Sequence, residues 1–518
     1  MSTAIPSPKP TGVPELELLQ KKSFQRIAET QTDELVVALC GPIGSSLHEV
    51  AELFATTASD RYGYECRTIR LSTFIQAHTP GLQPNSNRFI RINDLIKAGN
   101  DLRDKHDPQL LAELAVADIS HWRTENSKSE KLTGSDGATG VEKFVPKRVC
   151  HIIDSIKNQS ELDLLRKVYG NILYCIGVFS PLDYRERQLV QSGMTKAEVH
   201  TLIDKDSGEE NESGQTVRET FPHSDYFLRV DDTCLNSVPE KLERFFDIIL
   251  GTAIITPSPN ETAMYSAATA ALNSACLSRQ VGASITSSSG KLLSIGWNDV
   301  PKFGGNLYRA STHPGADDHR CFRWQYKTCL NDSTKDELSE NIVALLIEKK
   351  IVPDALKTEA LQAIKNSKVG NLIEFSRSIH AEMHAIIMAG QSGEGELRGA
   401  KLFCTTYPCH SCARHIIAAG IKEIYFIEPY KKSLAVKLHH DAITEDEKEP
   451  EKVKLIPYEG VAPNRYRDLF EMRAPRKEAG KAISTKSKLA HLKVQSSLES
   501  LPVLEGLVVK SLHEKQIL

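Results

Sequence analysis

The sequence lacks several features that would assign it to a specialised class of protein. No apolar run approaches the roughly 20 residues that cross a bilayer, and no signal-peptide pattern opens the chain. The 11 cysteines are scattered and do not form a disulfide framework. We therefore expect a cytoplasmic protein that does not contact membranes, in which paired cysteines bind metal more readily than they form disulfides.

The net charge is small and aromatic residues are few. The 64 Lys and Arg nearly cancel the 67 Asp and Glu, which leaves a net charge of −3, and aromatic residues make up 6%. Proteins that bind nucleic-acid strands usually combine a basic groove with stacking aromatics. The composition disfavours that class, although the Lys-rich C-terminal segment keeps it open as an alternative.

A chain of 518 residues with 40% hydrophobic residues has ample material for more than one packed core. The pattern along the chain predicts an α/β protein of two domains with a loose segment at each end. The predicted parts are a flexible arm at 1–22, a parallel-sheet domain at 23–252, a second α/β/α domain at 260–474 with an insertion at 302–372, and a tail at 475–518.

The first domain opens with an apolar strand, Leu35–Leu39, a Gly-rich turn and a helical pattern, which is typical of an α/β unit. Two further buried strands are predicted at 149–154 and 172–178, and the polar stretch Thr124–Thr139 is predicted to be a loop. Prolines at 257 and 259 indicate the domain boundary. Beyond it we expect a helix over Met264–Ser278, helices at His380 and from Cys409, and strands at 282–286, 292–296, 401–405 and 423–427.

Two short motifs carry the chemistry. They are His380-Ala381-Glu382, early in a helical pattern, and Pro408-Cys409-His410-Ser411-Cys412, between a strand and a helix. H-x-E followed by P-C-x-x-C is the known signature of zinc deaminases. The imidazole of His380 and the thiolates of Cys409 and Cys412 provide three zinc ligands and leave one tetrahedral position open, as catalytic zinc requires. Glu382 is then the general acid and base.

A Cys-x-x-Cys pair alone also occurs in structural zinc sites and in redox pairs. A structural site needs a fourth Cys or His, and a redox pair has no use for the His380-x-Glu382 motif in a preceding helix. Catalysis is therefore the favoured interpretation. A nucleotide-binding regulatory module without turnover is disfavoured for a related reason, because a pure binder has no need of Glu382.

Together with Ser278–Ala283 and Gly296–Pro301, these motifs resemble the deoxycytidylate deaminase family. The spacing after Arg279 differs slightly from that family's pattern, and Asp299 replaces its usual glycine. The expected substrate-binding residues are Asn298, Ala381 and Tyr407; the resemblance implies that Asn298 holds a sugar hydroxyl. Asn298 could instead be a turn residue bonded to its own backbone, and Tyr407 could be a core residue.

The stretches Ile427–Ala435, Leu438–Ile443, Pro457–Pro463 and Arg465-Tyr466 make the resemblance more specific. They look like the two-domain bacterial anti-phage dCTP deaminases, in which a nucleoside-kinase-like P-loop domain precedes a cytidine-deaminase-like domain. The resemblance implies hydrolysis of dCTP, and of dCMP, to the uracil deoxynucleotide and ammonia, which depletes nucleotides during phage infection. It also implies an inhibitory small RNA, which nothing in the composition shows. We further expect zinc as cofactor and a homo-oligomer, and a strand-level DNA or RNA cytosine deaminase stays open.

The first domain departs from a working P-loop. Counted from Gly41, the motif needs Gly, Lys and Ser or Thr at positions 46 to 48, where this chain has Ser46, Leu47 and His48. Without the lysine we expect no phosphoryl transfer. The turn could still cradle the phosphate of a regulatory nucleotide at the helix start, with Gly41, Gly44, Ser45 and Ser46 as the binding residues. A purely structural or assembly role is the alternative.

Several other residues invite a functional interpretation. His313, His319, Cys321 and Cys329 could hold a second, structural zinc, but their spacings are irregular, which favours unrelated residues. Asp154–Asn158 and Asp204–Asp206 resemble kinase elements, with an ordinary strand-end turn and a solvated acidic loop as alternatives. His384, one turn beyond His380, is expected to be packed or solvated, and Cys404 to be a buried strand thiol.

Overall fold

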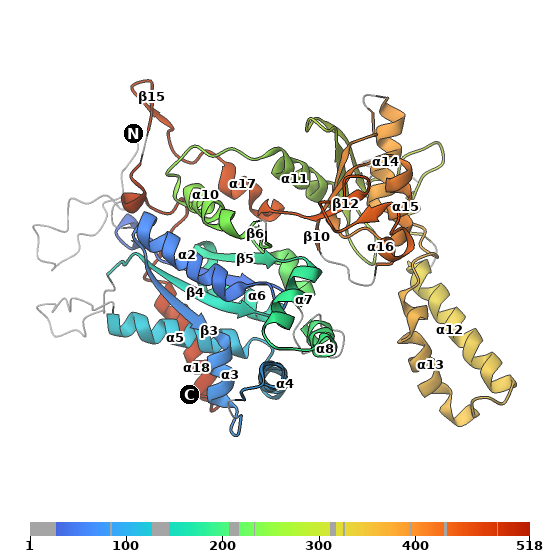
Figure 1. Cartoon of the computed structure of the whole chain (residues 1–518), viewed down its shortest axis with the longest axis horizontal. Helices are drawn as coiled ribbons and strands as arrows, with labels where there is room; N and C mark the ends of the chain where they lie inside the picture. Colours follow the sequence, from blue (N-terminus) through green and yellow to red (C-terminus); the bar gives the residue numbers. More distant parts are fainter. Residues whose placement is uncertain are drawn as a thin grey trace, which may run out of the picture.

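The computed structural model describes residues 27–82, 85–126, 145–206, 217–232, 234–310, 318–324, 327–393, 396–428, 433–483 and 485–518. These residues form two six-stranded sheets and two small two-stranded ones. Each large sheet, with its helices, makes a separate body (Figure 1). Figure 1 also shows a pair of helices that projects from the second body. The fold is thus mixed α/β with parallel-strand sheets, as predicted.

The first body is built from the N-terminal half of the chain and a short strand from the C-terminal half. Its sheet has the order β13-β6-β5-β2-β4-β3, and its strands are parallel except β13. The elements are β1 (Gln31–Thr32), β2 (Leu35–Cys40), α2 (Leu47–Tyr62), β3 (Glu65–Arg70), α3 (Leu71–His78), α4 (Arg88–Lys105), α5 (Leu110–Asn126), β4 (Val149–Ile156), α6 (Gln159–Tyr169), β5 (Leu173–Phe179), α7 (Leu182–Gln191), α8 (Lys196–Asp206), α9 (Val217–Thr220), β6 (Tyr226–Arg229), α10 (Val238–Leu250) and β13 (Gly460–Val461).

The right-handedness of strand-helix-strand connections decides which face of this sheet each helix covers. From β2 the chain crosses to β3 in one direction, whereas from β4 it crosses to β5 in the other. Because such crossovers are right-handed, α2 and α6 lie on opposite faces. Helix α10 packs beside α2, where Phe246 lies against Phe54 and Tyr62 with ring centroids 4.8 and 4.6 Å away.

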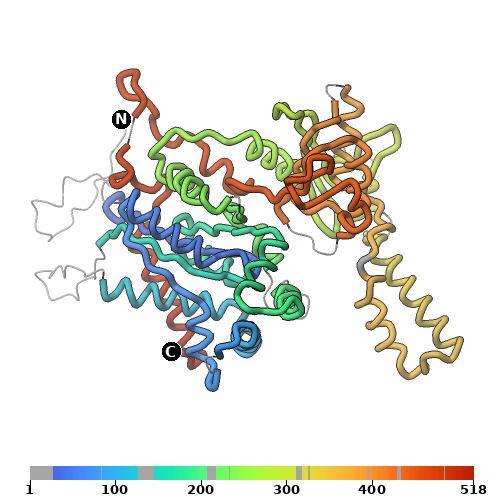
Figure 2. The backbone as a smooth tube through the Cα atoms, viewed as in Figure 1, coloured from blue at the N-terminus to red at the C-terminus, as the bar shows by residue number. Residues whose placement is uncertain are grey.

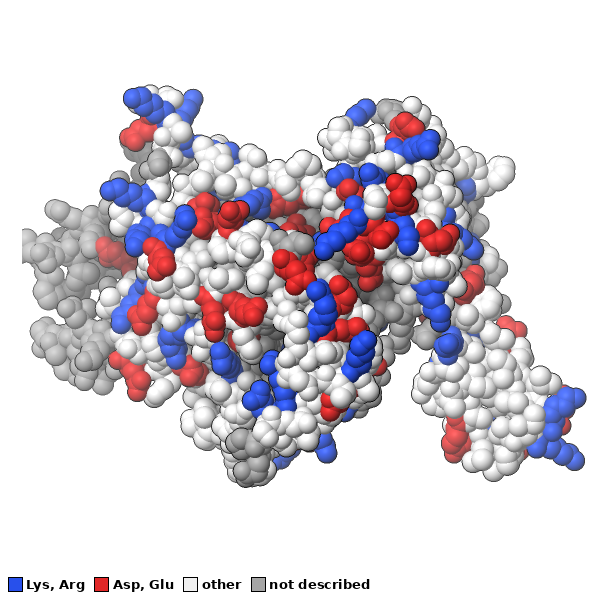
Figure 3. Space-filling model, viewed as in Figure 1, with Lys and Arg blue, Asp and Glu red and all other residues white. Residues whose placement is uncertain are grey.

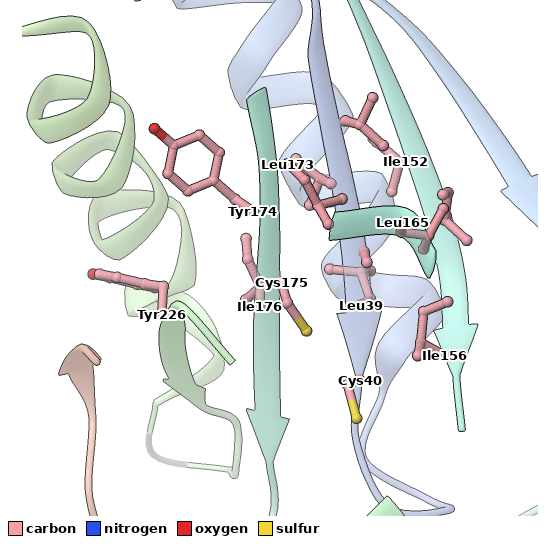
Figure 4. Packing of buried hydrophobic residues seen from close by; sticks show 14 of the residues in the cluster. Leu39, Cys40, Ile152, Ile156, Leu165, Leu173, Tyr174, Cys175, Ile176 and Tyr226 are labelled. Atoms are coloured by element: carbon pink, nitrogen blue, oxygen red, sulfur yellow. The ribbon is translucent and has the colours of Figure 1, made fainter. Parts of the chain in front are cut away.

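The core of the first body lies around the central strand β2, all of whose residues are buried. A parallel strand covered on both faces is expected to be continuously apolar, and Leu35–Cys40 follows that rule. Figure 4 shows Leu39 and Cys40 of β2 among side chains of the neighbouring strands, including Ile152 and Ile176. This packed sheet fixes the turn that follows β2.

The second body carries the C-terminal motifs. Its sheet has the order β11-β12-β10-β9-β7-β8, in which β7 is antiparallel to both of its neighbours and the other strands are parallel. The elements are α11 (Pro259–Ala271), β7 (Gly282–Thr286), β8 (Leu292–Trp297), α12 (Leu330–Glu348), α13 (Lys357–Lys365), α14 (Ala381–Ser392), β9 (Lys401–Thr406), α15 (His410–Ala418), β10 (Glu423–Glu428), α16 (Ala435–Leu438), β11 (Ile443–Thr444) and β12 (Val453–Pro457).

After the second body the chain returns to the first. Figure 2 shows this C-terminal stretch running back along the first body. It comprises β13, α17 (Tyr466–Phe470), β14 (Lys477–Glu478), β15 (Lys481–Ala482), β16 (Ser496–Ser497) and α18 (Leu501–Glu514). Strand β16 pairs with β1, and α18 packs on α5. No helix among the described residues is long and apolar enough to cross a membrane.

Most of the predicted elements are present close to the expected bounds. The predicted helix over Met264–Ser278 is wrong in its limits, because it begins at Pro259 and ends at Ala271. Ser258 caps its N-terminus by accepting a hydrogen bond from Glu261 N, and Pro259 suits the first helical position because it needs no backbone partner there. The arm at 1–22 and residues 127–139 of the predicted loop lie outside the described residues, and residues 124–126 end α5.

The segment after 475, for which no regular structure was expected, ends in α18. Leu501, Val508 and Leu512 are buried from this helix, at spacings that place them on one face. The same helix buries Glu505, whose carboxylate accepts hydrogen bonds from Arg123 of α5 at 2.9 and 3.0 Å. Arg123 also donates to Glu34 at 2.6 Å, and all three side chains are at most 1% exposed. A buried ion triad therefore fixes α18 to the first body.

Glu505→Ala is expected to lower the free energy of unfolding of the first body by about 3 kcal/mol, because removing one partner of a buried ion pair leaves the other poorly compensated. Urea denaturation followed by far-UV circular dichroism measures the change. Glu514→Ala on the same helix is the control, since the Glu514 side chain is 69% exposed. Equal midpoints for the two variants would contradict the structural role of the triad.

Candidate active site

The structure brings His380, Cys409 and Cys412 together, although 28 residues separate the first two. His380 Nδ1 lies 3.3 Å from the Sγ atom of each cysteine, and the three ligand atoms all lie within 4.8 Å of one another. Among the described residues this is the one group of three or more His, Cys, Asp or Glu side chains that could hold a metal ion. The predicted ligand set is therefore assembled in space.

Two helix starts position these ligands. His380 is the N-cap of α14 and Cys409 is the N-cap of α15. The Cys409 Sγ accepts a hydrogen bond from the backbone N–H of Cys412 at 3.4 Å. Unpaired N–H groups and the dipole at a helix start favour a thiolate, which is why this position suits a metal-binding cysteine.

The electrostatics of the cluster fit a divalent cation. Hydrogen bonds from Cys412 and then His380 outweigh burial and lower the pKa of the Cys409 thiol to about 4. The thiolate of Cys409, the form that binds metal, is therefore favoured, whereas the hydrogen bond with Cys409 and burial raise the pKa of the Cys412 thiol, so metal binding at Cys412 must release a proton. One imidazole nitrogen and two sulfurs in a small volume match the donor set of zinc, with one tetrahedral position left open.

Glu382 lies two residues beyond the first ligand and lines the same cleft, with only 3% of its surface exposed. Burial raises the pKa of this carboxyl group above its usual value. A raised pKa makes the protonated form of a carboxyl group more accessible, and a general acid and base must both accept and release a proton. Position and electrostatics thus agree with the predicted role.

The cleft at this cluster has a volume of about 550 Å³, which is within the range of small-molecule sites. Ala381, Asn298 and Tyr407 line it together with Glu382, so the predicted substrate residues do surround one space. The cleft also contains residues that the sequence analysis did not single out. These include three residues of α12, namely Asn331, Asp332 and Lys335, whereas Arg279, which also lines the cleft, belongs to the Ser278–Ala283 motif.

The arm formed by α12 and α13 explains that omission. Figure 1 shows it projecting from the second body, with the start of α12 next to that body. The first turns of α12 therefore form part of the cleft wall, whereas the rest of the arm extends away. The arm falls in the predicted insertion, and no motif or spacing within that insertion indicated that its first turns lie at the site.

The amide of Asn298 is bonded to nearby backbone. Its Oδ1 accepts from Val281 N at 2.7 Å, and its Nδ2 donates to Arg279 O at 2.8 Å. These bonds order the loop that carries Arg279 at the cleft. One further donor and one lone pair of the amide are not used by them. Contact with a sugar hydroxyl therefore stays a prediction.

Tyr407 is held in place from two sides. Its ring packs at 71° against Phe426 with centroids 4.8 Å apart, and its hydroxyl donates to Glu445 at 2.8 Å. The side chain is thus both packed and at the cleft, and its contact with the base stays a prediction.

Asp299, which stands where the resemblance expects glycine, has a structural part in this site. Its carboxylate accepts from Ala275 N at 3.0 Å and from Val300 N at 2.8 Å, and its own carbonyl accepts from Ile379 N at 3.0 Å. Because Ile379 precedes His380, Asp299 connects the Asn298 loop directly to the first zinc ligand.

Of the remaining candidates, His384 and Cys404 are buried and packed. His384 accepts a hydrogen bond from Trp297 N at 3.2 Å and lies edge-on to the Trp297 ring, which confirms that it is a packed histidine. Cys404 is a buried thiol of β9, also as expected. His319, Cys321 and Cys329 do not form a metal group among the described residues, which do not include His313.

The N-terminal candidates lie at a different place, in the turn between β2 and α2. Gly44 has a φ of +83°, and Ser46, the N-cap of α2, has a φ of +50°. Asp206 is 3% exposed at the end of α8, so it does not belong to a solvated loop. Gly44, Ser45 and Ser46 line a separate cavity in the first body.

Residues 257–428 match the family described as the cytidine and deoxycytidylate deaminase zinc-binding region. This range contains all three ligands and Glu382. Residues 257–428 form a domain of the cytidine and deoxycytidylate deaminase family, whose members are zinc-binding hydrolases.

Three of the relatives cover between 11% and 39% of the chain. ComE operon protein 2 of Bacillus subtilis is 46% identical over 56 residues, which are 11% of this chain and 29% of that protein. The deoxycytidylate deaminase of Enterobacteria phage T2 is 26% identical over 164 residues, or 31% of this chain and 74% of its own length. The structure of dCMP deaminase from the cyanophage S-TIM5 is 19% identical, with 39% of this chain and 100% of that chain aligned and a TM-score of 0.22.

Glu382→Ala is expected to retain zinc and to lose at least about 100-fold in turnover, the scale typical of a lost general acid or base. Zinc content by atomic absorption and ammonia release from a cytosine nucleotide measure the two properties. Glu396→Ala, at an exposed position after α14, is the control. A near-normal rate in the Glu382 variant would show that another group moves the proton.

Cys409→Ser and Cys412→Ser are each expected to lose zinc and activity together, since a serine hydroxyl is a poor substitute for a thiolate ligand. Cys404→Ser is the matched control, because Cys404 is equally buried but is not part of the ligand group. Metal analysis after gel filtration distinguishes the variants. A fully metallated and active Cys412→Ser protein would mean that the ligand set is wrong.

Proposed function

We propose that this protein hydrolyses the exocyclic amine of a cytosine deoxynucleotide, dCTP and also dCMP, to give the uracil deoxynucleotide and ammonia. The observation that carries this proposal is the buried carboxyl group of Glu382 in the same cleft as the His380, Cys409 and Cys412 ligand group. The deoxycytidylate deaminase of phage T2, which is similar over 164 residues, gives further support.

The protein's own groups account for the proton movements of this reaction. Zinc held by the three ligands would supply a Lewis acid that lowers the pKa of water. Glu382 takes a proton from the attacking water and delivers it to ring nitrogen N3 as a C4–O bond forms. It then transfers the second proton to the exocyclic nitrogen, the C4–N bond breaks and ammonia leaves. Burial of Glu382 favours this shuttling, because its raised pKa brings both protonation states within reach.

Recognition of a nucleotide, as opposed to a free base, is supported by the cations in the cleft. Arg279, in the loop before β7, and Lys335, in the second turn of α12, both line it, and Arg279 also pairs with Glu428. Lys335 is held at the site by bonds from its Nζ to Gly370 O at 3.2 Å and to Asp332 at 2.9 Å. Substrate phosphates would meet the ammonium group of Lys335 and the guanidinium of Arg279.

A cellular role in depleting cytosine nucleotides during phage infection follows from the resemblance of residues 427–466 to anti-phage dCTP deaminases. The first body would then be the P-loop, nucleoside-kinase-like unit of that group. The strand order β3-β4-β2-β5-β6 and the turn from β2 into α2 are compatible with this, but Leu47 stands where the P-loop lysine would be. We therefore expect this body not to transfer phosphate.

The alternative of a strand-level DNA or RNA deaminase receives less support. On the face seen in Figure 3, acidic and basic side chains are interspersed over both bodies. A groove for a nucleic-acid strand would instead gather basic side chains along one track. The face in Figure 3 shows no such track, and together with the net charge of −3 this favours a small nucleotide as the substrate.

Purified zinc-loaded protein offered dCMP, dCTP, CTP, cytidine and single-stranded DNA separately is expected to release ammonia from dCTP and dCMP. Lys335→Met should raise KM for dCTP about tenfold with little change in kcat, since a lost charge-assisted contact costs about 1.5 kcal/mol and acts on binding. Lys349→Met, at the far end of α12, is the control. Deamination of DNA alone would refute the proposal.

A further inference from the structure

A small pocket lies where the C-terminal stretch of the chain returns to the first body. It has a volume of about 230 Å³, and Asn171 and Tyr174, at the start of β5, form one side of it. Figure 4 shows the Tyr174 side chain at this end of β5. Strands β2 and β5 are parallel, so the pocket lies at the edge of the sheet where the strands begin. The turn that follows β2 lies at the opposite edge.

The other side of the pocket is rich in cations. Arg465, Arg473 and Lys493 line it, and Asp468 is the one acidic residue among its described lining residues. Asp468 accepts a hydrogen bond from Arg473 at 3.2 Å and lies 3.7 Å from the guanidinium group of Arg465. A single carboxylate is therefore shared by two guanidinium groups, which leaves the pocket with an excess of positive charge.

A second carboxylate, behind the pocket, does not remove this excess. The buried Nε of Arg465 lies 3.6 Å from Asp225 and has no hydrogen-bond partner among the described residues. Asp225 already accepts hydrogen bonds from Cys175 N at 2.7 Å and from Arg166 at 3.3 Å. Its charge is thus largely committed to other groups, and the guanidinium group of Arg465 is only partly neutralised.

Lys493 is the cation that is hardest to explain without a ligand. Its Nζ donates to Leu469 O at 3.0 Å, and no carboxylate in the described part of the chain pairs with it. Burial, followed by repulsion from Arg476 and Arg473, lowers the pKa of this ammonium group. The backbone N–H of Lys493 bonds to Ile249 O of α10, which fixes the residue at the pocket. The surroundings therefore disfavour the charge of Lys493 unless an anion is bound nearby.

The size and the donors of the pocket indicate which anion fits. Sites that bind whole small molecules usually have volumes of about 300 to 1,000 Å³, so this pocket suits a single oxyanion better than a nucleotide. Guanidinium groups match the oxygens of phosphate in pairs, and a lysine adds a point charge.

Asp468 adds a further requirement, because a carboxylate in an anion site repels a ligand that has no proton to donate. Hydrogen phosphate, the dianion of inorganic phosphate, retains one P–O–H group. Sulfate has none, and a phosphate monoester has lost its own above about pH 6. The combination of three cations and one carboxylate therefore favours inorganic phosphate over the other two anions.

We propose that this pocket binds inorganic phosphate, with Arg465, Arg473 and Lys493 as its cations and Asp468 as the acceptor of its remaining O–H group. The bound anion neutralises Lys493 and connects it to α17, which carries Asp468. Phosphate binding consequently stabilises the C-terminal stretch against the start of β5. Neither the zinc cleft nor the turn after β2 contributes a residue to this pocket.

Calorimetric titration of the full-length zinc protein, in mildly alkaline buffer of constant ionic strength, tests the site. Sodium phosphate is expected to bind at least about tenfold more tightly than sodium sulfate or ribose 5-phosphate, since only phosphate satisfies Asp468. Arg473→Met and Lys493→Met should each weaken phosphate binding at least about tenfold, because each loses a charge-assisted contact. Asp468→Asn should reduce the preference for phosphate over sulfate, because an amide can also donate a hydrogen bond.

Stability measurements distinguish a ligand-binding lysine from a structural one. In phosphate-free buffer, Lys493→Met is expected to unfold at the same or a higher urea concentration than the natural protein, because a poorly compensated cation is removed. Added phosphate should raise the midpoint of the natural protein and leave that of Lys493→Met unchanged. Lys481→Met, at an exposed position of β15 in the same stretch, is the matched control and should respond to phosphate as the natural protein does.

Two further variants identify the site that binds. Phosphate binding that survives in Arg473→Met and Lys493→Met, but is lost in Lys335→Met of the zinc cleft or in Lys157→Met beside the turn after β2, would overturn the proposal. Equal affinity for phosphate and sulfate, tighter binding of ribose 5-phosphate than of phosphate, or no phosphate binding at all would overturn it as well.

Discussion

The active site depends on how closely α14 lies on the sheet of the second body. At Gly296 of β8, a Cβ atom would fall 2.4 Å from the backbone oxygen of Ala381 and 2.4 Å from the nitrogen of Ala385. Only glycine allows this approach. Because His380 caps α14, the separation of helix and strand decides where the imidazole lies relative to the thiols of α15. Gly282 serves α11 in the same way, since a Cβ there would lie 1.9 Å from Ala267 O. Two glycines, on adjacent strands, thus position helices on the two sides of β7 and β8.

Burial of the reacting groups follows from this close packing and has an electrostatic cost. Glu382 and the two cysteines are largely removed from water, and two thiolates with a carboxylate would be three negative charges in one small volume. A buried charge without a partner is strongly unfavourable. A dication balances two of these charges, so we infer that metal binding and local stability of the cluster are coupled. The same burial raises the pKa of Glu382, which favours catalysis. Removing this carboxyl group from water also costs free energy of folding, so burial that favours catalysis lowers stability.

The carboxylate of Glu261 in the second body also forms hydrogen bonds with groups of the first body. Glu261, in the first turn of α11, accepts from Ser258 N at 2.7 Å and completes the cap of that helix. It also accepts from Val461 N of β13 at 2.9 Å and from both terminal nitrogens of Arg244 in α10, at 2.9 and 2.7 Å. Because β13 pairs with β6, the first helix of the deaminase domain is bonded directly to the sheet of the first body. Glu261 therefore joins the sheet of the first body to α11, which packs on β7 in the second body.

The sequence predicted those parts of the molecule whose pattern is local. His380, Glu382 and the cysteine pair lie within short motifs, β2 and β5 are continuously apolar, and β4 is mostly apolar, so the motifs and these strands were found. Strand β3 was not, because Glu65–Arg70 is an edge strand with mostly polar, exposed residues, and β6 is only four residues long. Lys335 illustrates the larger difficulty. It reaches the cleft from a segment far away in the sequence, and a single lysine has no spacing to identify it. The stretch Asp154–Asn158 was singled out as kinase-like, but its contact with the turn after β2 could not be predicted. Lys157 follows β4 and donates to Gly41 O at 2.8 Å, a contact that depends on β4 lying next to β2 in the sheet. Strand order is set by packing between distant segments, which no local pattern records.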